Sequence, residues 1–170
     1  IEKVVQSVGW KENKENIAKY GKSTKSDNNI HLRSLLRSSI LSKAVKLGIP
    51  SVVKEGLQYF YTYKSGQHVG LTGDVEDVVL VTGVLHGDES DYDWVYNKFL
   101  NETFQQNQQR LLYALASANV PYLQYRTLDL ALSGNVRKQD LLRLIFQVSL
   151  YSNTGHIYAW AFIRDNWERL

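Results

Sequence analysis

The sequence predicts an all-α protein built from stacked pairs of helices. Apolar residues recur at three- and four-residue spacing through most of residues 31–170, which is the period of a helix with one apolar face. Glycine and proline stand between these stretches, where helices end and begin. The first helices of successive pairs are expected near residues 32, 74, 107 and 139, and the last two intervals are close to 33 residues. Such a period predicts an α-solenoid of the HEAT or armadillo-like kind.

The chain divides into a polar region, residues 1–30, and a helical-repeat region, residues 31–170. Residues 11–29 are rich in Lys, Asn and Ser, which predicts a loop or linker. A chain of 170 residues with 44% hydrophobic content suits one domain, or a large piece of one, with a real core.

Gly48 and Pro50 separate the first two expected helices. Gly48 accepts the left-handed turn that ends a helix, and Pro50 suits the first turn of the next helix. The first helix has an apolar face at Leu32, Leu35, Leu36, Ile40, Ala44 and Leu47. Arg33 and Arg37 fall elsewhere on its helical wheel. The second helix has an apolar face at Val53, Leu57, Phe60 and Tyr61, and Gly66 ends it.

Residues 75–85, VEDVVLVTGVL, are compatible with a strand or a helix. The valines favour a strand. Asp74, Glu76 and Asp77 favour the first turn of a helix, where acids meet the positive end of the helix dipole. Helical spacing is also kept by Val75, Val78, Val79, Thr82 and Leu85. We therefore predict a helix here.

Five further helices are expected after residue 90. Ser90 and Asp93 look like the capping pair of the first, and Pro121 opens the third. Residues 133–135, Ser-Gly-Asn, close that third helix. The predicted apolar stripes are Tyr92, Val95, Tyr96, Phe99 and Leu100; Gln108, Leu111, Leu112, Leu115 and Ala118; Leu128, Ala131 and Leu132; Leu141, Leu144, Ile145 and Val148; and Trp160, Ile163, Trp167 and Leu170.

Composition argues against several classes of function. The net charge is +3, and Lys and Arg alternate with acids, so no basic stripe for nucleic acid is expected. There is no Cys, which excludes disulfides and thiolate chemistry. No apolar run approaches the roughly 20 residues that span a bilayer. The chain starts at Ile1 and contains no Met, which predicts a fragment of a longer protein.

The segment LHGDES, residues 85–90, gathers His86, Asp88 and Glu89. Two interpretations are a metal or proton-transfer site and a polar turn between helices. The zinc-peptidase motif His-Glu-x-x-His needs two histidines four residues apart, and this chain has no His-Glu dipeptide. Gly87 and the capping residues after it favour the turn, with His86 near a helix C-terminus. No catalytic residue and no metal ligand is therefore predicted in this chain.

Two other places carry candidate functional residues. Arg137, Gln139 and Asp140 cluster where a helix begins. They form either a contact for a peptide carboxylate, through Arg137 and Gln139, or a capped helix start with Asp140 in the first turn, and we favour the second interpretation. Asn101–Glu102–Thr103 is an N-glycosylation sequon, which is used only if the chain passes through the secretory route.

Several segments together resemble the C-terminal helical domain of zinc metallo-aminopeptidases, the family of aminopeptidase N, glutamyl aminopeptidase and the endoplasmic reticulum aminopeptidases. The most specific part is VRKQD at 136–140, followed by AWAFIRDNWERL at 159–170. The others are VGW at 8–10, HLRSLLRSSILSKAVKLG at 31–48, VTGVLHGDESDYDWVYNKFLNET at 81–103 and RLLYALASANVPYLQYRTLDLAL at 110–132.

The resemblance implies a fragment of a larger helical bowl, within a parent enzyme that removes N-terminal residues from peptides. In the family, zinc is held by a separate catalytic domain upstream, whose motifs are absent from this sequence. The C-terminal domain would wall the substrate chamber and dock on that catalytic domain. It would contact the peptide substrate and contribute to a homodimer in some members.

The alternative is a binding or adhesion module, either a catalytically inactive relative of the aminopeptidases or an unrelated helical-repeat scaffold. The sequence leaves open whether the parent is an active enzyme. The resemblance implies a membrane-anchored parent with an extracellular or luminal ectodomain. Because Cys is absent, a cytoplasmic location also stays open.

Overall fold

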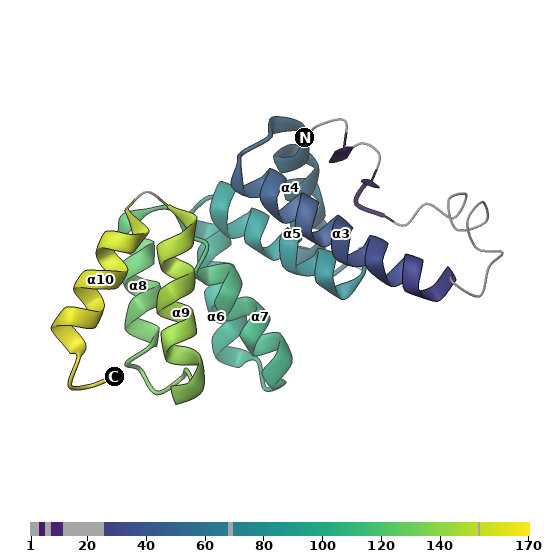
Figure 1. Ribbon diagram of the computed structural model, residues 1–170. Coiled ribbons are helices and arrows are strands. Elements are labelled where there is room, and N and C mark those ends of the chain that lie inside the picture. The colour runs from purple at the N-terminus through teal and green to yellow at the C-terminus, as the bar shows by residue number, and fades with distance from the viewer. Residues whose placement is uncertain (1–3, 6–7, 12–25, 68–69, 153) are drawn as a thin grey trace. The chain divides into compact units, whose positions relative to one another are not determined.

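The structure, a computed structural model, describes residues 4–5, 8–11, 26–67, 70–152 and 154–170 (Figure 1). These residues form α-helices joined by short connections and contain no strand, so the predicted all-α, solenoid-like fold is confirmed. The helices are α3 (Ser26–Lys46), α4 (Pro50–Lys64), α5 (Gly73–His86), α6 (Glu89–Asn101), α7 (Gln105–Leu115), α8 (Pro121–Leu130), α9 (Lys138–Tyr151) and α10 (Gly155–Asn166). Helix α3 begins inside the stretch predicted as a loop, and residues 12–25 of that stretch lie outside the described residues.

The chain forms two compact units, Ile1–Thr82 and Gly83–Leu170. In the first unit, Trp10 is 3% exposed and its ring centroid lies 5.5 Å from that of Tyr59 on α4. Gly56 of α4 lies against the same ring. A Cβ at position 56 would lie 2.9 Å from Thr82 Cγ2 and 3.0 Å from Trp10 Cη2. Glycine at this position therefore lets α4, α5 and Trp10 approach one another.

The ends of the first helices follow the prediction. Gly48 has a φ of 67° and Gly66 a φ of 81°, in the left-handed region that glycine adopts without strain. Pro50 is the first residue of α4. The ambiguous segment is the helix α5, and its predicted face is buried: Val75, Val78, Val79, Thr82 and Leu85.

The predicted faces of α3 and α4 are wrong at most positions: Ala44 and Phe60 are buried as predicted, and the others are exposed or half-buried. Four leucines of the expected α3 face are exposed: Leu32 at 61%, Leu35 at 49%, Leu36 at 52% and Leu47 at 65%. The buried residues of α3 are Arg37, Leu41, Val45 and, from the predicted face, Ala44. In α4 the buried residues are Val52, Gly56 and Phe60, while Tyr61 is exposed. Helix α3 has apolar residues on more than one side, and it packs against α4, so its spacing alone does not select the buried side.

In the second unit, α6 packs along α7 and α9 packs along α10, and α8 contacts both α9 and α10. The sequence period had paired α7 with α8, and the structure corrects that pairing. The predicted stripes are otherwise largely buried: Tyr92, Val95, Phe99, Leu111, Leu112, Leu115, Leu128, Leu141, Leu144, Ile145 and Val148. Leu100 is an exception, with 45% of its surface exposed.

A polar contact inside this core joins α6 to α8. The hydroxyl oxygens of Tyr92 and Thr127 lie 2.9 Å apart, and Thr127 Oγ1 also lies 2.9 Å from the carbonyl oxygen of Leu123. Either hydroxyl can donate in the Tyr92–Thr127 bond, because both lie near the same carbonyl oxygen of Leu123. Burial raises the pKa of Tyr92 to about 12. On the surface side, Arg126 pairs with Asp93, and its guanidinium lies 5.4 Å from the centroid of the Tyr92 ring.

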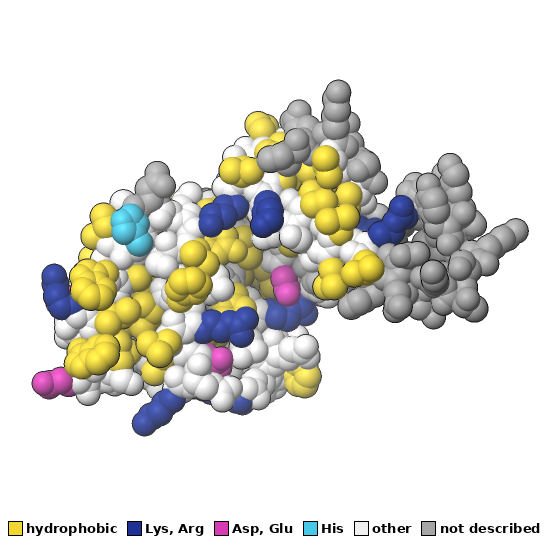
Figure 2. All heavy atoms as spheres, in the orientation of Figure 1, with side chains coloured by type: hydrophobic (Ala, Val, Ile, Leu, Met, Phe, Trp, Pro, Cys, Tyr) yellow, Lys and Arg dark blue, Asp and Glu magenta, His cyan; other side chains and the backbone are white. Residues whose placement is uncertain are grey.

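The outer sides of α9 and α10 are rich in exposed apolar side chains, which Figure 2 shows gathered over this part of the molecule. They are Leu142, Phe146, Leu150, Ile157, Trp160 and Trp167, with exposed fractions between 41% and 73%. The predicted face of the last helix is therefore wrong: α10 buries Gly155, Ala159 and Phe162, whereas Trp160 is 67% exposed. Within the described ranges, no helix is both long and apolar enough to cross a membrane.

Candidate functional site

The segment LHGDES forms the turn between α5 and α6. His86 is the last residue of α5, and Asp88 is the N-cap of α6. Asp88 Oδ1 accepts the backbone N–H of Asp91 at 3.1 Å, and Asp91 Oδ2 accepts the backbone N–H of Asp88 at 3.2 Å. This reciprocal pair is a capping box, which satisfies two N–H groups at a helix start. The predicted capping pair is corrected: Ser90 donates its hydroxyl to Asp88 Oδ1 at 2.6 Å, and Asp93 pairs with Arg126.

Gly87 fits this turn because it has no side chain. A Cβ at position 87 would lie 2.3 Å from the carbonyl oxygen of Gly83 and 2.5 Å from Asp91 Oδ2. The polar residues of LHGDES are therefore explained by the geometry of a tight helix-to-helix turn.

Zinc, which the family resemblance implies for the parent protein, has no ligand set in the part of the chain that the structure describes. Within that part, no three His, Asp or Glu side chains come together in the way that a metal ion needs. His86 lies in the α5–α6 turn and His156 on α10, while the side chains of His31 and His68 lie outside the described residues. The residues described here do not fit a zinc centre.

A pocket lies in the second unit between the start of α7, the end of α6 and the start of α9. It holds about 240 Å³ of empty space, part of it open to solvent. The enclosed part is only about 10 Å³, room for about one water molecule and far below the roughly 300–1,000 Å³ of a small-molecule site. Its lining is rich in amides and contains one Arg and one Asp: Phe99, Gln105, Gln108, Gln109, Leu112, Asn135, Val136, Arg137 and Asp140.

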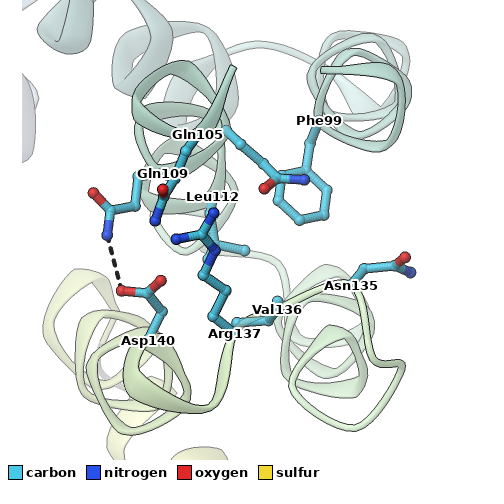
Figure 3. A pocket seen from close by; sticks show the side chains of 9 residues that line it. Phe99, Gln105, Gln109, Leu112, Asn135, Val136, Arg137 and Asp140 are labelled. Atoms are coloured by element: carbon cyan, nitrogen blue, oxygen red, sulfur yellow. Dashed lines mark hydrogen bonds between the residues drawn. The ribbon is translucent and has the colours of Figure 1, made fainter. Parts of the chain in front are cut away.

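The two charged groups of the pocket differ in their surroundings. Asp140 is 7% exposed and accepts a hydrogen bond from Gln109 Nε2 at 2.9 Å, which ties α9 to α7. Arg137 is the N-cap of α9, is exposed, and makes no side-chain capping bond. Figure 3 shows its guanidinium reaching toward Gln105 and Leu112 while Asp140 turns to Gln109. Among the described residues, no carboxylate lies within ion-pair distance of Arg137.

The structure separates the two residues proposed for a peptide carboxylate. Arg137 lines the pocket, whereas Gln139 is exposed and does not line it. Asp140 does lie in the first turn of α9, as the capped-start interpretation required. The pocket's amides come from α7 and the α8–α9 connection, up to 32 residues away in sequence from Arg137. No local sequence signal marks them, because tertiary packing brings them together.

The geometry gives the pocket one kind of chemistry. An unpaired guanidinium offers a planar fork of donors that matches a carboxylate. The neighbouring amide groups supply both donors and acceptors, which suit a peptide backbone. Catalysis by acid, base or nucleophile would need a second reactive group near Arg137, and the only other ionisable side chain that lines the described pocket is that of Asp140, which is already bonded to Gln109.

Asn101, the sequon asparagine, is the last residue of α6, and the connection Glu102–Phe104 follows it. Its side chain is exposed, and Nδ2 donates to the carbonyl oxygen of Asn97 at 2.8 Å. Glu102 accepts the backbone N–H of Phe104 at 2.8 Å, and this bond is the main cause of a lowered pKa at Glu102. The connection therefore has a defined conformation at the surface.

Comparison with known proteins identifies the class to which this helical domain belongs. The sequence matches the ERAP1-like C-terminal domain family over residues 1–170. It is 30% identical to glutamyl aminopeptidase of Sus scrofa over 172 aligned positions, covering 100% of this chain and 16% of the relative. It is 32% identical to glutamyl aminopeptidase of Bos taurus, covering 82% of this chain and 15% of the relative. A probable aminopeptidase 2 of Sulfurisphaera tokodaii is 34% identical over 56% of this chain and 12% of the relative.

This chain belongs to the ERAP1-like C-terminal domain family, and the relatives it matches over most or all of its length are named aminopeptidases. The resemblance predicted from the sequence is thereby confirmed. The chain spans about a sixth of the length of the curated relatives that it matches.

Proposed function

We propose that this chain is the non-catalytic C-terminal segment of a zinc aminopeptidase, in which it walls the substrate chamber and docks on the catalytic domain. The observation that carries the proposal is the family match along the whole chain, together with related segments in named aminopeptidases. The zinc would be held by the parent's catalytic domain. The parent would be membrane-anchored, with an extracellular or luminal ectodomain.

The exposed apolar side chains on α9 and α10 support a contact with another part of the parent protein. Single soluble domains rarely leave a large apolar patch in water, and such patches mark interaction sites. Leu142, Phe146 and Leu150 are four residues apart along α9, so they lie on one side of that helix. The alternative is that the same surface contacts a second copy of the protein in a homodimer. Light scattering of the full-length parent with and without Phe146→Glu distinguishes the two, because only a dimer contact changes the mass.

The activity is tested by the release of N-terminal amino acids from peptides by the full-length parent, with this chain alone as the control. Release by the parent, lost with a chelator and restored by zinc, supports the proposal. This chain alone hydrolyses nothing in that case. A folded parent that releases nothing would instead support a binding or adhesion module on the aminopeptidase scaffold.

Within this function, we propose that Arg137 contacts the carboxylate end of a peptide. Support comes from its place in an amide-lined pocket without a carboxylate partner among the described residues. Gln139 lies outside the pocket lining, so its contact with the same peptide would have to be made at the rim. We therefore expect Arg137 to contribute more to this contact than Gln139.

The test compares a peptide with a free C-terminus and the same peptide with an amidated C-terminus. Arg137→Ala should raise the KM of the parent for the free acid by roughly tenfold, the equivalent of one charged hydrogen bond, and leave the amide unchanged. Lys138→Ala is the matched control, since it removes the same charge from the neighbouring exposed position. Equal effects on both peptides would exclude carboxylate recognition.

A further inference from the structure

The chain contains a single Asn-x-Ser/Thr sequon, at Asn101–Glu102–Thr103. We propose that Asn101 carries an N-linked glycan in the parent protein. The proposal rests on the proposed extracellular or luminal location, because the glycan is attached in the secretory route. A glycan on this chain can sit at no other asparagine.

The folded structure leaves the sequon accessible. Asn101 and Thr103 are both exposed, at the end of α6 and in the connection to α7. Glu102 between them has extended backbone angles, φ −79° and ψ 128°, so the chain leaves the helix before it reaches Thr103. The carboxylate of Glu102 is turned toward α7, where it accepts the N–H of Phe104 and, at 3.4 Å, an N–H of the Asn107 side chain. It therefore leaves the amide of Asn101 uncovered.

The side-chain bond of Asn101 is compatible with the modification. Nδ2 carries two hydrogens, and one of them is donated to the carbonyl oxygen of Asn97. Transfer from a lipid-linked oligosaccharide pyrophosphate forms a bond between Nδ2 and C1 of the first sugar. The C1–O bond breaks, its electron pair leaves with the lipid pyrophosphate, and Nδ2 loses one proton. The second N–H remains, so the bond to Asn97 can persist and orient the glycan at the end of α6.

The modification would define which edge of the second unit faces solvent. Asn101 lies four residues before Gln105, the first residue of α7 and part of the Arg137 pocket. Four residues of extended chain span at most about 14 Å. The glycan would therefore stand near the mouth of that pocket, which places Arg137 close to a solvent-facing rim of the domain.

The experiment uses the full-length parent recovered from the secretory route of cultured cells. Trypsin releases residues 99–110, because Lys98 and Arg110 flank them. Digestion with a peptide N-glycosidase in heavy-oxygen water converts a glycosylated Asn101 to labelled Asp, which mass spectrometry detects. Wild type and Thr103→Ser, which keeps the sequon, should both yield the labelled peptide. Asn101→Gln and Thr103→Ala should lose the label completely.

Recovery of unmodified residues 99–110 as the main form from secreted wild type would overturn the proposal. So would a labelled peptide from Thr103→Ala. Peptidase activity measured on the same preparation tests the proposed function separately, because glycan occupancy is read without any turnover. An active but unmodified parent contradicts the glycan alone, and an inactive but glycosylated parent contradicts the enzyme alone.

Discussion

Helices α6 and α3 show how differently one kind of sequence pattern can be used. In α6, the predicted stripe supplies the buried residues Tyr92, Val95 and Phe99. In α3, the predicted stripe is exposed at Leu35 and Leu36, and the helix buries another side. Both helices were predicted as helices, and both are helices.

The difference lies in how many sides of each helix are apolar. One side of α6 is polar and carries Ser90, Asn97 and Lys98. Only the opposite side is apolar, so only that side can pack into the core. Helix α3 has leucines all along, and Arg37 is among its buried residues at 7% exposure. Periodicity therefore establishes the helix, whereas the neighbouring helix decides which side of it is buried.

The largest expected effect comes from a matched pair of leucines within α3. Leu41 is fully buried and Leu36 is 52% exposed. Leu41→Ala should lower the free energy of unfolding by about 2–5 kcal/mol, because it leaves a cavity. Leu36→Ala should change it by less than about 0.5 kcal/mol. Chemical denaturation of both variants measures the two changes in the free energy of unfolding. Equal changes would mean that the predicted leucine face is buried after all.

The buried hydroxyl of Tyr92 makes α6 sensitive to alkaline pH. Its pKa is raised to about 12 in the folded protein from the ordinary value of 10.0, chiefly by burial. The stabilisation that accompanies a raised tyrosine pKa is fully present below pH 10, where the hydroxyl is protonated in both the folded and the unfolded state. Between pH 10 and 12 that stability is lost, by about 1.4 kcal/mol per pH unit. Denaturation midpoints across this range should fall more steeply for wild type than for Tyr92→Phe, and parallel curves would contradict the buried hydroxyl.

The entry to α6 depends on Gly87. Gly87→Ala should cost about 1–3 kcal/mol, because the new Cβ would overlap the carbonyl oxygen of Gly83. Gly134→Ala is the control, since a Cβ there would meet nothing within 4 Å, although its φ of 79° favours glycine. Thermal unfolding should place Gly134→Ala closer to wild type. A loss below about 0.5 kcal/mol for Gly87→Ala itself would show that the turn relaxes to admit the methyl group.

The smallest effect concerns the cap of α6. Asp88→Ala should cost about 1 kcal/mol, because it removes half of the capping box. Ser90→Ala removes one exposed hydrogen bond to Asp88 and should cost less. Urea titration of the two variants settles their order. A larger loss for Ser90→Ala would favour the cap that the sequence had predicted.

The sequence predicted the helices well because each depends on local signals. Pro50 and Pro121 mark helix starts, and Gly48 marks an end. The capping pair was displaced by two residues, since Asp88 and Ser90 are both acceptable N-caps and only the backbone chooses between them. Local sequence signals thus predicted where the helices lie, and their ends are placed to within about one helical turn.

The pocket shows where prediction from sequence stops. Arg137 and Asp140 were recognised as a polar cluster, but their partner Gln109 lies on another helix. The carboxylate of Asp140 is used for packing, and the guanidinium of Arg137 is left for solvent or a ligand. That division follows from the approach of α7 to α9, which no local pattern specifies.

The packing of α6 along α7 and of α9 along α10 also bears on how the chain acquires its structure during synthesis. Each pair is made of consecutive helices, so its contacts can form as soon as the second helix leaves the ribosome. Among the described helices, α10 emerges last, and with α9 it carries the exposed Phe146 and Trp160. A nascent chain that pauses there presents this apolar surface to the cytosol or the lumen. We expect chaperones that recognise apolar segments to engage the nascent protein at this point.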